Sequence, residues 1–376
     1  MADRTLSPPA VLGMAIADVD TPALLLDLDA FEHNLDTLDR SLAGRPIRIR
    51  PHAKSHKCPD IAHIQLQRGA VGVCCQKVSE AEALVDAGIG DIMISNEVIG
   101  ATKLARLAAL AMCARVSVLA DAAEGIDALQ RAAATVGAHI DVLVEIDVGA
   151  GRCGAQPGAA AAALAQRIAG QPNLHFRGIH AYHGGAQHLR TPAEREQAVA
   201  AATALVTTTL DALAHIGLAA EIVTGAGTGT YLLEASGSVY NEIQPGSYVF
   251  MDADYGRNLD AGGAPLRTFR HSLFVLTTVM SRPTASRAVV DAGLKAHSID
   301  SGLPLVADLP GARYSRASDE HGVIELDAGQ ALPLGTKIRL IPGHCDPTVN
   351  LHDWLVCVRN GIVEAVWPIA GRGAFY

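Results

Sequence analysis

The stretch Arg48-Ile49-Arg50-Pro51-His52-Ala53-Lys54-Ser55-His56-Lys57 ends a short aliphatic run and places a lysine between two histidines at alternating positions. In βα barrels, catalytic residues lie at the carboxyl ends of the strands. A lysine on the inner side of a barrel mouth loses hydration, which lowers its pKa from about 10.4 and favours a neutral amine that can form a Schiff base. A solvated basic loop is the alternative, and this stretch by itself does not decide between the two.

Around this stretch, short aliphatic runs alternate with Ala- and Leu-rich segments from residue 23 to about residue 250, which predicts repeated βα units and a parallel sheet. The predicted strands are Ala23–Leu28, Ile47–Pro51, Val71–Cys75, Asp91–Ser95, Val116–Leu119, Asp141–Ile146, His175–Ala181, Glu221–Thr224 and Glu242–Phe250. Helices predicted between them include Ala30–Leu42, Ser79–Ala87 and Ala122–Thr135. There is one run more than a (β/α)8 barrel needs.

After residue 270 the pattern changes to strands without long helices. The predicted strands are His271–Met280, Ala288–Asp291, Lys337–Leu340, Trp354–Arg359 and Ile362–Trp367. Asn360-Gly361 joins the last two, and Asn-Gly between alternating strands is a strong hairpin signal. The C-terminal third is therefore predicted to be a β domain that also takes the ninth run, Glu242–Phe250, and that packs on the barrel with a site between them.

Length, charge and cysteine content limit the class of protein. The 376 residues exceed what one core usually organises, and the net charge of -9 comes without a Lys/Arg-rich run, so we expect two domains and no nucleic-acid partner. We find no export signal in residues 1–20 and no stretch of about 18 apolar residues, and we therefore expect a cytoplasmic protein without a membrane partner. Seven cysteines without a C-x-x-C pair predict reduced, mostly buried thiols.

The glycine-rich segment Thr224-Gly225-Ala226-Gly227-Thr228-Gly229 follows the seventh barrel strand if Ile47–Pro51 is counted first. Glycines let the backbone approach an oxyanion closely, and the loops after strands 7 and 8 bind phosphate in many barrels. A tight turn is the commoner explanation of such a segment. Its position favours a phosphate site, because the loop would lie on the same barrel face as Lys54.

The segment Pro342-Gly343-His344-Cys345-Asp346-Pro347-Thr348 lies in the predicted β domain. On an extended backbone the side chains of His344 and Asp346 point the same way, so the two can share one cation. One imidazole and one carboxylate suit Mn²⁺ or Mg²⁺ better than a closed zinc site, although Zn²⁺ stays open. A capped loop without metal is the alternative.

Three further candidates follow the fifth and sixth barrel strands. They are Arg152 in Gly151–Gly154, Tyr182 in Ala181–Gly184, and His188 shortly after. Each could be a structural residue. Together they would place an arginine, a tyrosine and a histidine around one barrel mouth, as an active site requires.

Many segments resemble one family over almost the whole chain, from Asp20 to Gly373. They are RPHAKSHKCPDIA at 50–62, GVCCQKVSEAEA at 72–83, ISNEVIG at 94–100, VGAGRCG at 148–154, AYHG at 181–184, GSYVFMDADYG at 246–256, VVDAGLK at 289–295, DEHG at 319–322 and GHCDPTVNLHDW at 343–354. They resemble the fold-type III family of pyridoxal 5′-phosphate (PLP) enzymes, which includes alanine racemases and D-serine dehydratases, and are most similar to its D-threonine aldolases.

This resemblance implies an α/β fold, with a PLP-binding (β/α)8 barrel over residues 29–255 and a mainly β domain of residues 1–28 and 256–376 that carries the metal site. The first run, Ala23–Leu28, then belongs to the β domain. The resemblance also implies that Lys54 forms the Schiff base with PLP. Further cofactor contacts are implied for Gln76, Arg152, Tyr182, Thr224, Gly225, Gly227, Thr228, Gly229, Ser247 and Tyr248, and metal contacts for His344 and Asp346.

The implied reaction is retro-aldol cleavage of a D-3-hydroxy-amino acid, such as D-threonine to glycine and acetaldehyde. It must remove the proton of the β-hydroxyl group, for which His188 or a metal-bound hydroxide is the candidate base. If the pKa of the hydroxyl is about 15.7, like that of water, a histidine base near 6.5 faces a gap of roughly 9 units, on the order of 12 kcal/mol. A divalent cation removes much of that gap.

Other activities remain open. Residues 252–257 and 289–304 also resemble 3-hydroxy-D-aspartate aldolases, whose substrate carries a second carboxylate that Arg257 or Lys295 would neutralise. D-serine dehydratases carry H-x-C at the metal position, where this sequence has Asp346. A racemase needs a second acid/base that we do not locate, and PLP carrier proteins lack the β domain. A homodimer is left open.

Overall fold

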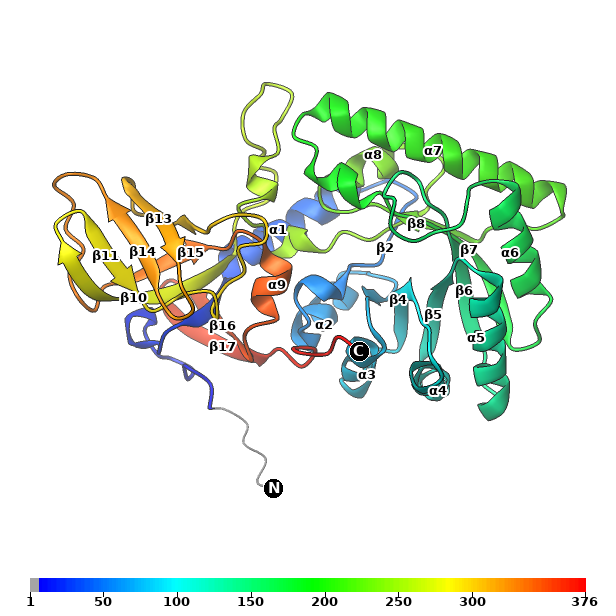
Figure 1. The fold of residues 1–376 in the computed structure, drawn as a ribbon, viewed down its shortest axis with the longest axis horizontal. Coiled ribbons are helices and arrows are strands. Elements are labelled where there is room, and N and C mark those ends of the chain that lie inside the picture. The colour runs from blue at the N-terminus through cyan, green and yellow to red at the C-terminus, as the bar shows by residue number, and fades with distance from the viewer. Residues whose placement is uncertain (1–6) are drawn as a thin grey trace.

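The computed structural model describes residues 7–376, so the first six residues of the predicted segment 1–28 lie outside the described part of the chain. Two sheets organise it (Figure 1). One sheet has eight strands in the order β2-β9-β8-β7-β6-β5-β4-β3, and each pair of neighbouring strands in it runs parallel. The other has nine mostly antiparallel strands and lies at the opposite end of the molecule.

The eight-stranded sheet closes into a barrel, because a bridge between His52 and Cys74 connects β2 to β3. Its strands are β2 (Arg48–Ile49), β3 (Val73–Cys75), β4 (Asp91–Glu97), β5 (Arg115–Ala120), β6 (Ile140–Glu145), β7 (Leu174–Ala181), β8 (Ile222–Gly225) and β9 (Glu242–Ile243). Its helices are α1 (Leu28–Leu42), α2 (Pro59–Gln67), α3 (Val78–Asp86), α4 (Ala101–Leu110), α5 (Ala123–Val136), α6 (Ala159–Ala169), α7 (Pro192–His215) and α8 (Tyr231–Ser236). The predicted (β/α)8 barrel is confirmed.

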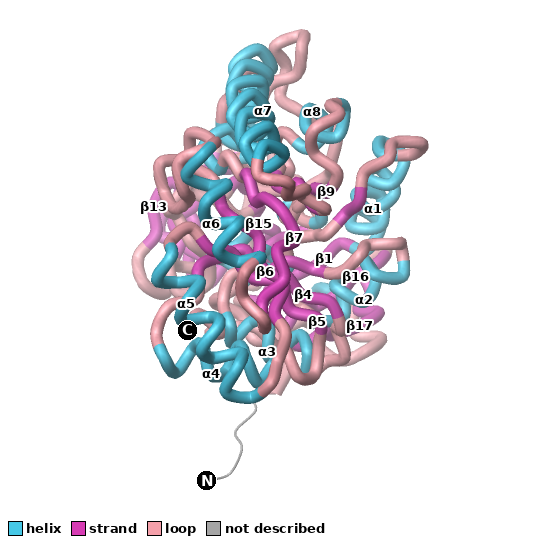
Figure 2. Tube along the Cα trace, turned by 90° about the vertical axis from the view of Figure 1, so that its right-hand side faces the viewer, coloured by secondary structure: helices cyan, strands magenta, loops and turns pink. Residues whose placement is uncertain are grey.

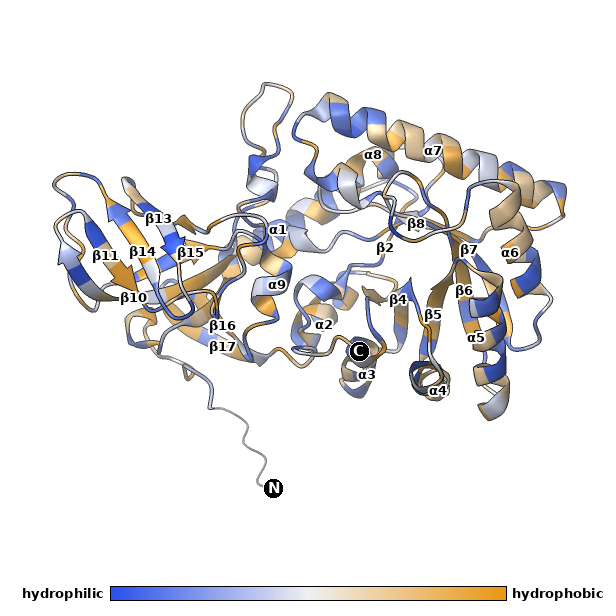
Figure 3. Ribbon diagram, in the orientation of Figure 1, coloured by the Kyte–Doolittle hydropathy of each residue, from blue (hydrophilic) through white to orange (hydrophobic). Residues whose placement is uncertain are grey.

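The barrel strands are apolar on both faces, which is why they read as continuous aliphatic runs. In β4, Met93 faces the barrel interior, where it packs with inward residues of four other strands, whereas Ile92 and Ile94 belong to the core beneath the helices. The inward cluster consists of Cys74, Met93, Leu119, Leu143 and Ile222. Hydropathy follows this arrangement, with apolar strands inside and polar residues along the outer helix surfaces (Figure 3).

The β domain combines the first strand with the C-terminal third of the chain. Its strands are β1 (Ala23–Asp27), β10 (Leu273–Thr284), β11 (Arg287–Val290), β12 (Leu305–Val306), β13 (Ala312–Ala317), β14 (Gly322–Leu326), β15 (Lys337–Ile341), β16 (Trp354–Arg359) and β17 (Ile362–Pro368). β1 pairs antiparallel with β10 and parallel with β16, so the first run belongs to this domain. The residue boundaries 28 and 255 stay predictions.

The predicted hairpin is present, since Asn360 and Gly361 both have positive φ between β16 and β17. The predicted strand Glu242–Phe250 is wrong beyond Ile243, and its placement in the β domain is wrong too, because β9 pairs with β2 and β8 in the barrel. Pro245 has no N–H for a strand ladder, and residues 247–249 form a 3-10 turn. Strands β12, β13 and β14 were not predicted: β12 has only two residues, and the exposed positions of β13 and β14 carry charged residues that weaken the apolar alternation.

One helix contradicts the expectation that no apolar stretch of about 18 residues occurs. The 24 residues of α7, rich in Ala, Thr and Val, are long and apolar enough to cross a membrane, and 28% of their apolar window is buried. A single helix of this kind is weak evidence for a membrane, because helices of soluble proteins pass the same test. Here α7 lies on the outside of the barrel, against α6 and β7 (Figure 2).

All seven cysteines are free thiols. Cys58, Cys74, Cys75, Cys345 and Cys357 are buried, while Cys113 is exposed. The prediction of reduced and mostly buried cysteines is confirmed.

Candidate active site

A cavity of about 370 Å³ lies at the carboxyl ends of the barrel strands and is completed by the β domain. Most of the predicted site residues meet there, although they come from segments spread over almost 300 residues. The predicted residues that line it are Lys54, Gln76, Arg152, Tyr182, His188, Gly227, Thr228, Ser247, His344 and Asp346. The fold therefore brings the candidate cofactor, base and metal residues into one space.

Lys54 is the one lysine among the residues that line this cavity. It sits in the 3-10 turn Ala53–Ser55 directly after β2, and its backbone N–H donates to Nδ1 of His52. The sequence-based expectation that the pKa of Lys54 is lowered is wrong for the protein without a bound cofactor. Burial is the largest single effect and lowers the pKa of Lys54, but Tyr182, Asp346 and Glu80 together raise it overall.

The loop after β8 provides a cradle at the far side of the cavity. The side-chain oxygen of Thr228 is buried and has no hydrogen-bond partner among the described residues. A Cβ at Gly227 would lie 2.6 Å from Oε1 of Gln187, so the backbone here runs close to its neighbours. An unpaired buried donor beside a glycine-lined cavity fits a phosphate group.

His344 and Asp346 both line the cavity, but not on the extended backbone that the sequence suggested. His344 is the extended N-cap residue of the short helix α9 (Cys345–Val349), and Asp346 lies in its first turn. Nδ1 of His344 lies 2.7 Å from Oδ2 of Asp300. Burial lowers the pKa of His344, but the nearby Asp346 carboxylate and the Asp300 contact together raise it overall. Nε2 remains for a cation, the arrangement common in histidine metal ligands.

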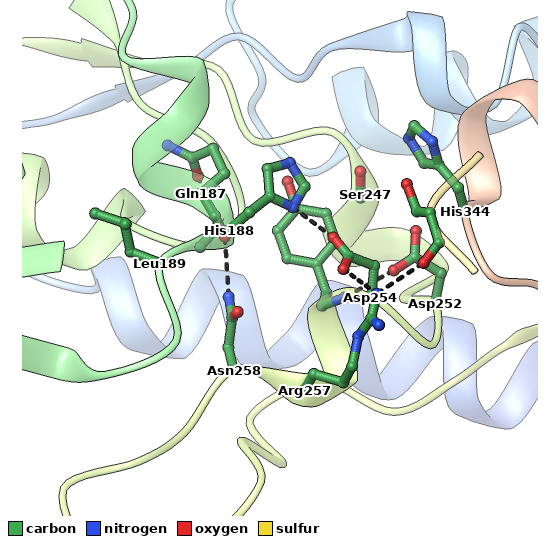
Figure 4. A network of polar contacts seen from close by, with 12 residues as sticks. Gln187, His188, Leu189, Ser247, Asp252, Asp254, Arg257, Asn258 and His344 are labelled. Atoms are coloured by element: carbon green, nitrogen blue, oxygen red, sulfur yellow. Dashed lines mark hydrogen bonds and ion pairs between the residues drawn. The ribbon is translucent and has the colours of Figure 1, made fainter. Parts of the chain in front are cut away.

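His188 lines the cavity from the end of η3 (Gly184–His188), which follows β7. Its Nδ1 lies 2.5 Å from Oδ2 of Asp254 (Figure 4). Its ring centroid is 5.5 Å from that of Tyr255. Asp254 lies in the loop between barrel and β domain and was not predicted to take part in the site.

Comparisons with known proteins match nearly the whole chain. A family model described as the alanine racemase N-terminal domain matches residues 26–254, and a serine dehydratase domain model matches residues 272–358. The chain is 49% identical to a D-threonine aldolase of Arthrobacter sp, over 98% of this chain and 97% of that protein. It is 48% identical to a 3-hydroxy-D-aspartate aldolase of Paracoccus denitrificans, over 98% of this chain and 96% of that protein.

A solved structure, that of D-threonine aldolase from Filomicrobium marinum, matches with a TM-score of 0.95 and 52% identity, covering 98% of this chain and 100% of that chain. This chain belongs to the D-threonine aldolase family. Members of the family are lyases with a fold-type III PLP barrel, which confirms the predicted fold, enzyme class and PLP cofactor.

Four residues that the family resemblance implied for PLP do not line the cavity. They are Thr224, Gly225, Gly229 and Tyr248. Each is committed to packing or to a protein hydrogen bond: Thr224 accepts from Gln244, Tyr248 accepts from Gln65, and a Cβ at Gly225 would meet the carbonyl oxygen of Ala181 at 2.3 Å. Gly229 donates its N–H to Oε1 of Gln187.

Arg152 is held by an acidic cluster behind the cavity. Its guanidinium donates to Oε1 of Glu145 at 3.5 Å, and the ligand atoms of Glu97, Glu145 and Cys153 all lie within 4.8 Å of one another. Burial raises the pKa of Glu97, whereas His180 and Arg152 hold the pKa of Glu145 low despite burial. Because Arg152 already offsets the charge, this cluster is better explained as a carboxyl pair that shares a proton than as a metal centre.

Several cavity residues were missed from the sequence, among them Ser95, His180, Gln244 and Tyr255. His180 shares a hydrogen bond with Gln244 at 3.2 Å, and His52 shares one with Ser95 at 2.9 Å, so polar pairs form the floor of the family's cofactor site. One signal was available for His180. It lies in β7 two residues before Tyr182, which directly follows that strand, and residues at that spacing on an extended backbone share a face.

Proposed function

We propose that this chain catalyses retro-aldol cleavage of D-3-hydroxy-amino acids, with D-threonine cleaved to glycine and acetaldehyde, using PLP at Lys54 and a divalent cation at His344 and Asp346. One observation carries the proposal. The cavity is lined together by an amine, an imidazole with a free nitrogen, and a histidine–carboxylate pair. Family membership at 49% identity over nearly the full chain supports the reaction class.

PLP, when bound, supplies an electron sink for the breaking Cα–Cβ bond. The residues of the chain bind and orient it. Lys54 would attach it covalently, the loop with Gly227 and Thr228 would offer donors to its phosphate, and Arg152, which lines the same cavity, would contact its ring. Glu145 pairs with Arg152 and so keeps that guanidinium in place.

A divalent cation, when bound, supplies positive charge that makes the β-hydroxyl group of the substrate more acidic. His344 and Asp346 would hold it, with Asp300 fixing the orientation of the His344 ring. One imidazole and one carboxylate leave most positions for water and substrate oxygens, which favours Mn²⁺ or Mg²⁺. His188 would accept the hydroxyl proton at Nε2.

The β-substituent is proposed to be uncharged. The names of the two relatives do not separate D-threonine from 3-hydroxy-D-aspartate, since both are about equally similar. The candidate partners for a second carboxylate are already paired: Arg257 donates to Asp254 and to the Ser301 carbonyl, and Lys295 pairs with Glu320. Neither lines the cavity, and an unpaired carboxylate there would cost several kcal/mol. Cleavage of 3-hydroxy-D-aspartate is the second candidate.

The test is glycine release by the purified holoenzyme from D-threonine, D-phenylserine and 3-hydroxy-D-aspartate, with L-threonine as the stereochemical control. Activity should require PLP, stop with EDTA and return with Mn²⁺ or Mg²⁺. Release of ammonia and a keto acid in place of glycine would show a dehydratase and contradict the proposal.

A further inference from the structure

His188 and Asp254 are 66 residues apart in the sequence, and the fold brings their side chains together beside the cavity (Figure 4). Nδ1 of His188 lies 2.5 Å from Oδ2 of Asp254. A carboxylate can only accept hydrogen bonds, so Nδ1 carries the proton of this contact. In a neutral imidazole the lone pair then lies on Nε2, which has no hydrogen-bond partner among the described residues.

Asp254 is itself fixed from several sides. Its side chain is 7% exposed, and Oδ1 accepts from Nη2 of Arg190 at 2.6 Å and from Nη2 of Arg257. Arg190 also donates to the backbone carbonyl of Asp254, whose own N–H donates to the carbonyl of Gly343. Burial acts to raise the pKa of Asp254, but the arginine and histidine contacts hold it below its usual value. The carboxylate is therefore ionised and immobile.

The contact with Asp254 restricts the orientation and the tautomer of the His188 ring. The His188 side chain is 46% exposed, so without a fixed partner its ring would sample several orientations and both tautomers. Asp254 does not line the cavity, so its influence on a bound substrate has to pass through a residue that does.

We propose that Asp254 is a positioning residue that holds the Nδ1–H of His188, so that Nε2 accepts the proton of the substrate β-hydroxyl group. In this step the O–H bond breaks, its electrons stay on oxygen, an Nε2–H bond forms, and the carboxylate stabilises the imidazolium ion. The inference rests on the proposed function and adds a residue to it. A purely structural Asp254, serving only to neutralise Arg190 and Arg257, is the competing explanation.

A double-mutant cycle on the Mn²⁺-loaded holoenzyme separates the two. Asp254→Asn should lower kcat for D-threonine by about 100-fold and change KM by less than about threefold, because a base acts in the transition state. In a His188→Ala background the same change should lower kcat by less than about threefold. Asp260→Asn is the matched change: among residues 7–376 the Asp260 side chain accepts only from the backbone N–H groups of Gly262 and Ala264, so this variant should behave as wild type.

Two results would overturn the positioning role: a kcat of Asp254→Asn within about threefold of wild type, or an equal loss from Asp254→Asn with and without His188. PLP content and the thermal midpoint of each variant show whether it has folded.

Histidine ¹⁵N NMR of the holoenzyme gives a readout that does not need turnover. His188 should be the Nδ1–H tautomer in wild type and shift toward the Nε2–H tautomer in Asp254→Asn. The same tautomer in both proteins would contradict the proposal. If the tautomer changes but wild type releases no glycine from any D-3-hydroxy-amino acid, the proposed function and the proton-accepting role fail, while the Asp254–His188 contact stands.

Discussion

Nζ of Lys57 lies 2.6 Å from Oε1 of Glu80, in an ion pair whose side chains are 10% and 4% exposed. Glu80 also accepts from the backbone N–H groups of Gln76 and Lys77, so this pair anchors the start of α3 beside the cavity. Lys57 is therefore committed to the fold, whereas Lys54, three residues earlier, lines the cavity.

The first prediction follows from that difference. The purified protein should be yellow, and borohydride should fix PLP covalently to the peptide that contains Lys54, as mass spectrometry can show. Lys54→Ala should be colourless after dialysis, whereas Lys103→Ala, on the exposed face of α4, should stay yellow. Labelling of Lys57 or Lys77 without Lys54 would contradict the assignment.

Asp346 should matter for activity more than for folding. It lies at the start of the short helix α9, and in the described part of the chain its side chain accepts only from Ser247 at 3.5 Å and Cys345 at 3.2 Å, so its loss removes little that holds the fold. Asp346→Ala should keep PLP, lose bound metal and lose most metal-dependent cleavage, measured by metal analysis and glycine release.

Asp353→Ala, which removes a surface partner of Arg372, is the matched control and should keep both metal and activity. Full turnover by Asp346→Ala would remove the metal hypothesis. Weak dehydratase activity in Asp346→Cys would support the family comparison.

Arg257→Ala distinguishes the two substrate candidates. With Arg257 paired to Asp254 outside the cavity, its loss should change kcat/KM for D-threonine only slightly, since Arg190 still holds Asp254. Arg267→Ala, an exposed arginine nearby, is the control. The prediction would be wrong if wild type preferred 3-hydroxy-D-aspartate over D-threonine by more than about 100-fold in kcat/KM and this preference disappeared in Arg257→Ala. A 100-fold preference corresponds to about 2.7 kcal/mol.

Gly225→Ala should destabilise the barrel. A Cβ there would lie 2.3 Å from the backbone carbonyl oxygen of Ala181, which cannot move without disturbing β7. We expect a loss of about 1–3 kcal/mol in the free energy of unfolding, measured in urea. Gly237→Ala, where the nearest atom would be 3.5 Å away, should change it much less. Equal effects of the two substitutions would show that the steric argument is wrong.

Glu234 should make stability depend on pH. Burial raises its pKa to about 8 from an ordinary value of 4.5. Between these values the unfolded chain has lost the proton that the folded chain still holds, so this group's contribution to stability falls as pH rises, by at most about 1.4 kcal/mol per unit.

Glu234→Gln cannot lose that proton, so its free energy of unfolding relative to wild type should increase between pH 5 and pH 8. Urea unfolding at both values measures the difference, with the exposed Glu196→Gln as control. A difference between wild type and Glu234→Gln that stays constant over this range would contradict the raised pKa.

The sequence by itself determined the architecture and much of the site. Strand alternation, helical periodicity and turn residues are local properties, so the repeated βα units and the Asn360-Gly361 hairpin followed from them, whereas the place of Ala23–Asp27 in the β domain was implied only by the family resemblance. Residues at the carboxyl ends of parallel strands must share one face, which brought Lys54 and Tyr182 to one cavity.

Tertiary structure decided what depends on distant neighbours. His344 and Asp346 share the cavity through a helix N-terminus rather than an extended segment, and the pKa of Lys54 is raised because anionic groups outweigh burial. Asp252 and Asp254 are the same residue type two positions apart, and nothing in the sequence distinguishes their roles. In the structure, Asp252 accepts from backbone N–H groups, whereas Asp254 contacts the His188 side chain. Local patterns specify elements, but the pairing of side chains 66 residues apart depends on packed geometry and on the sum of charges around each group.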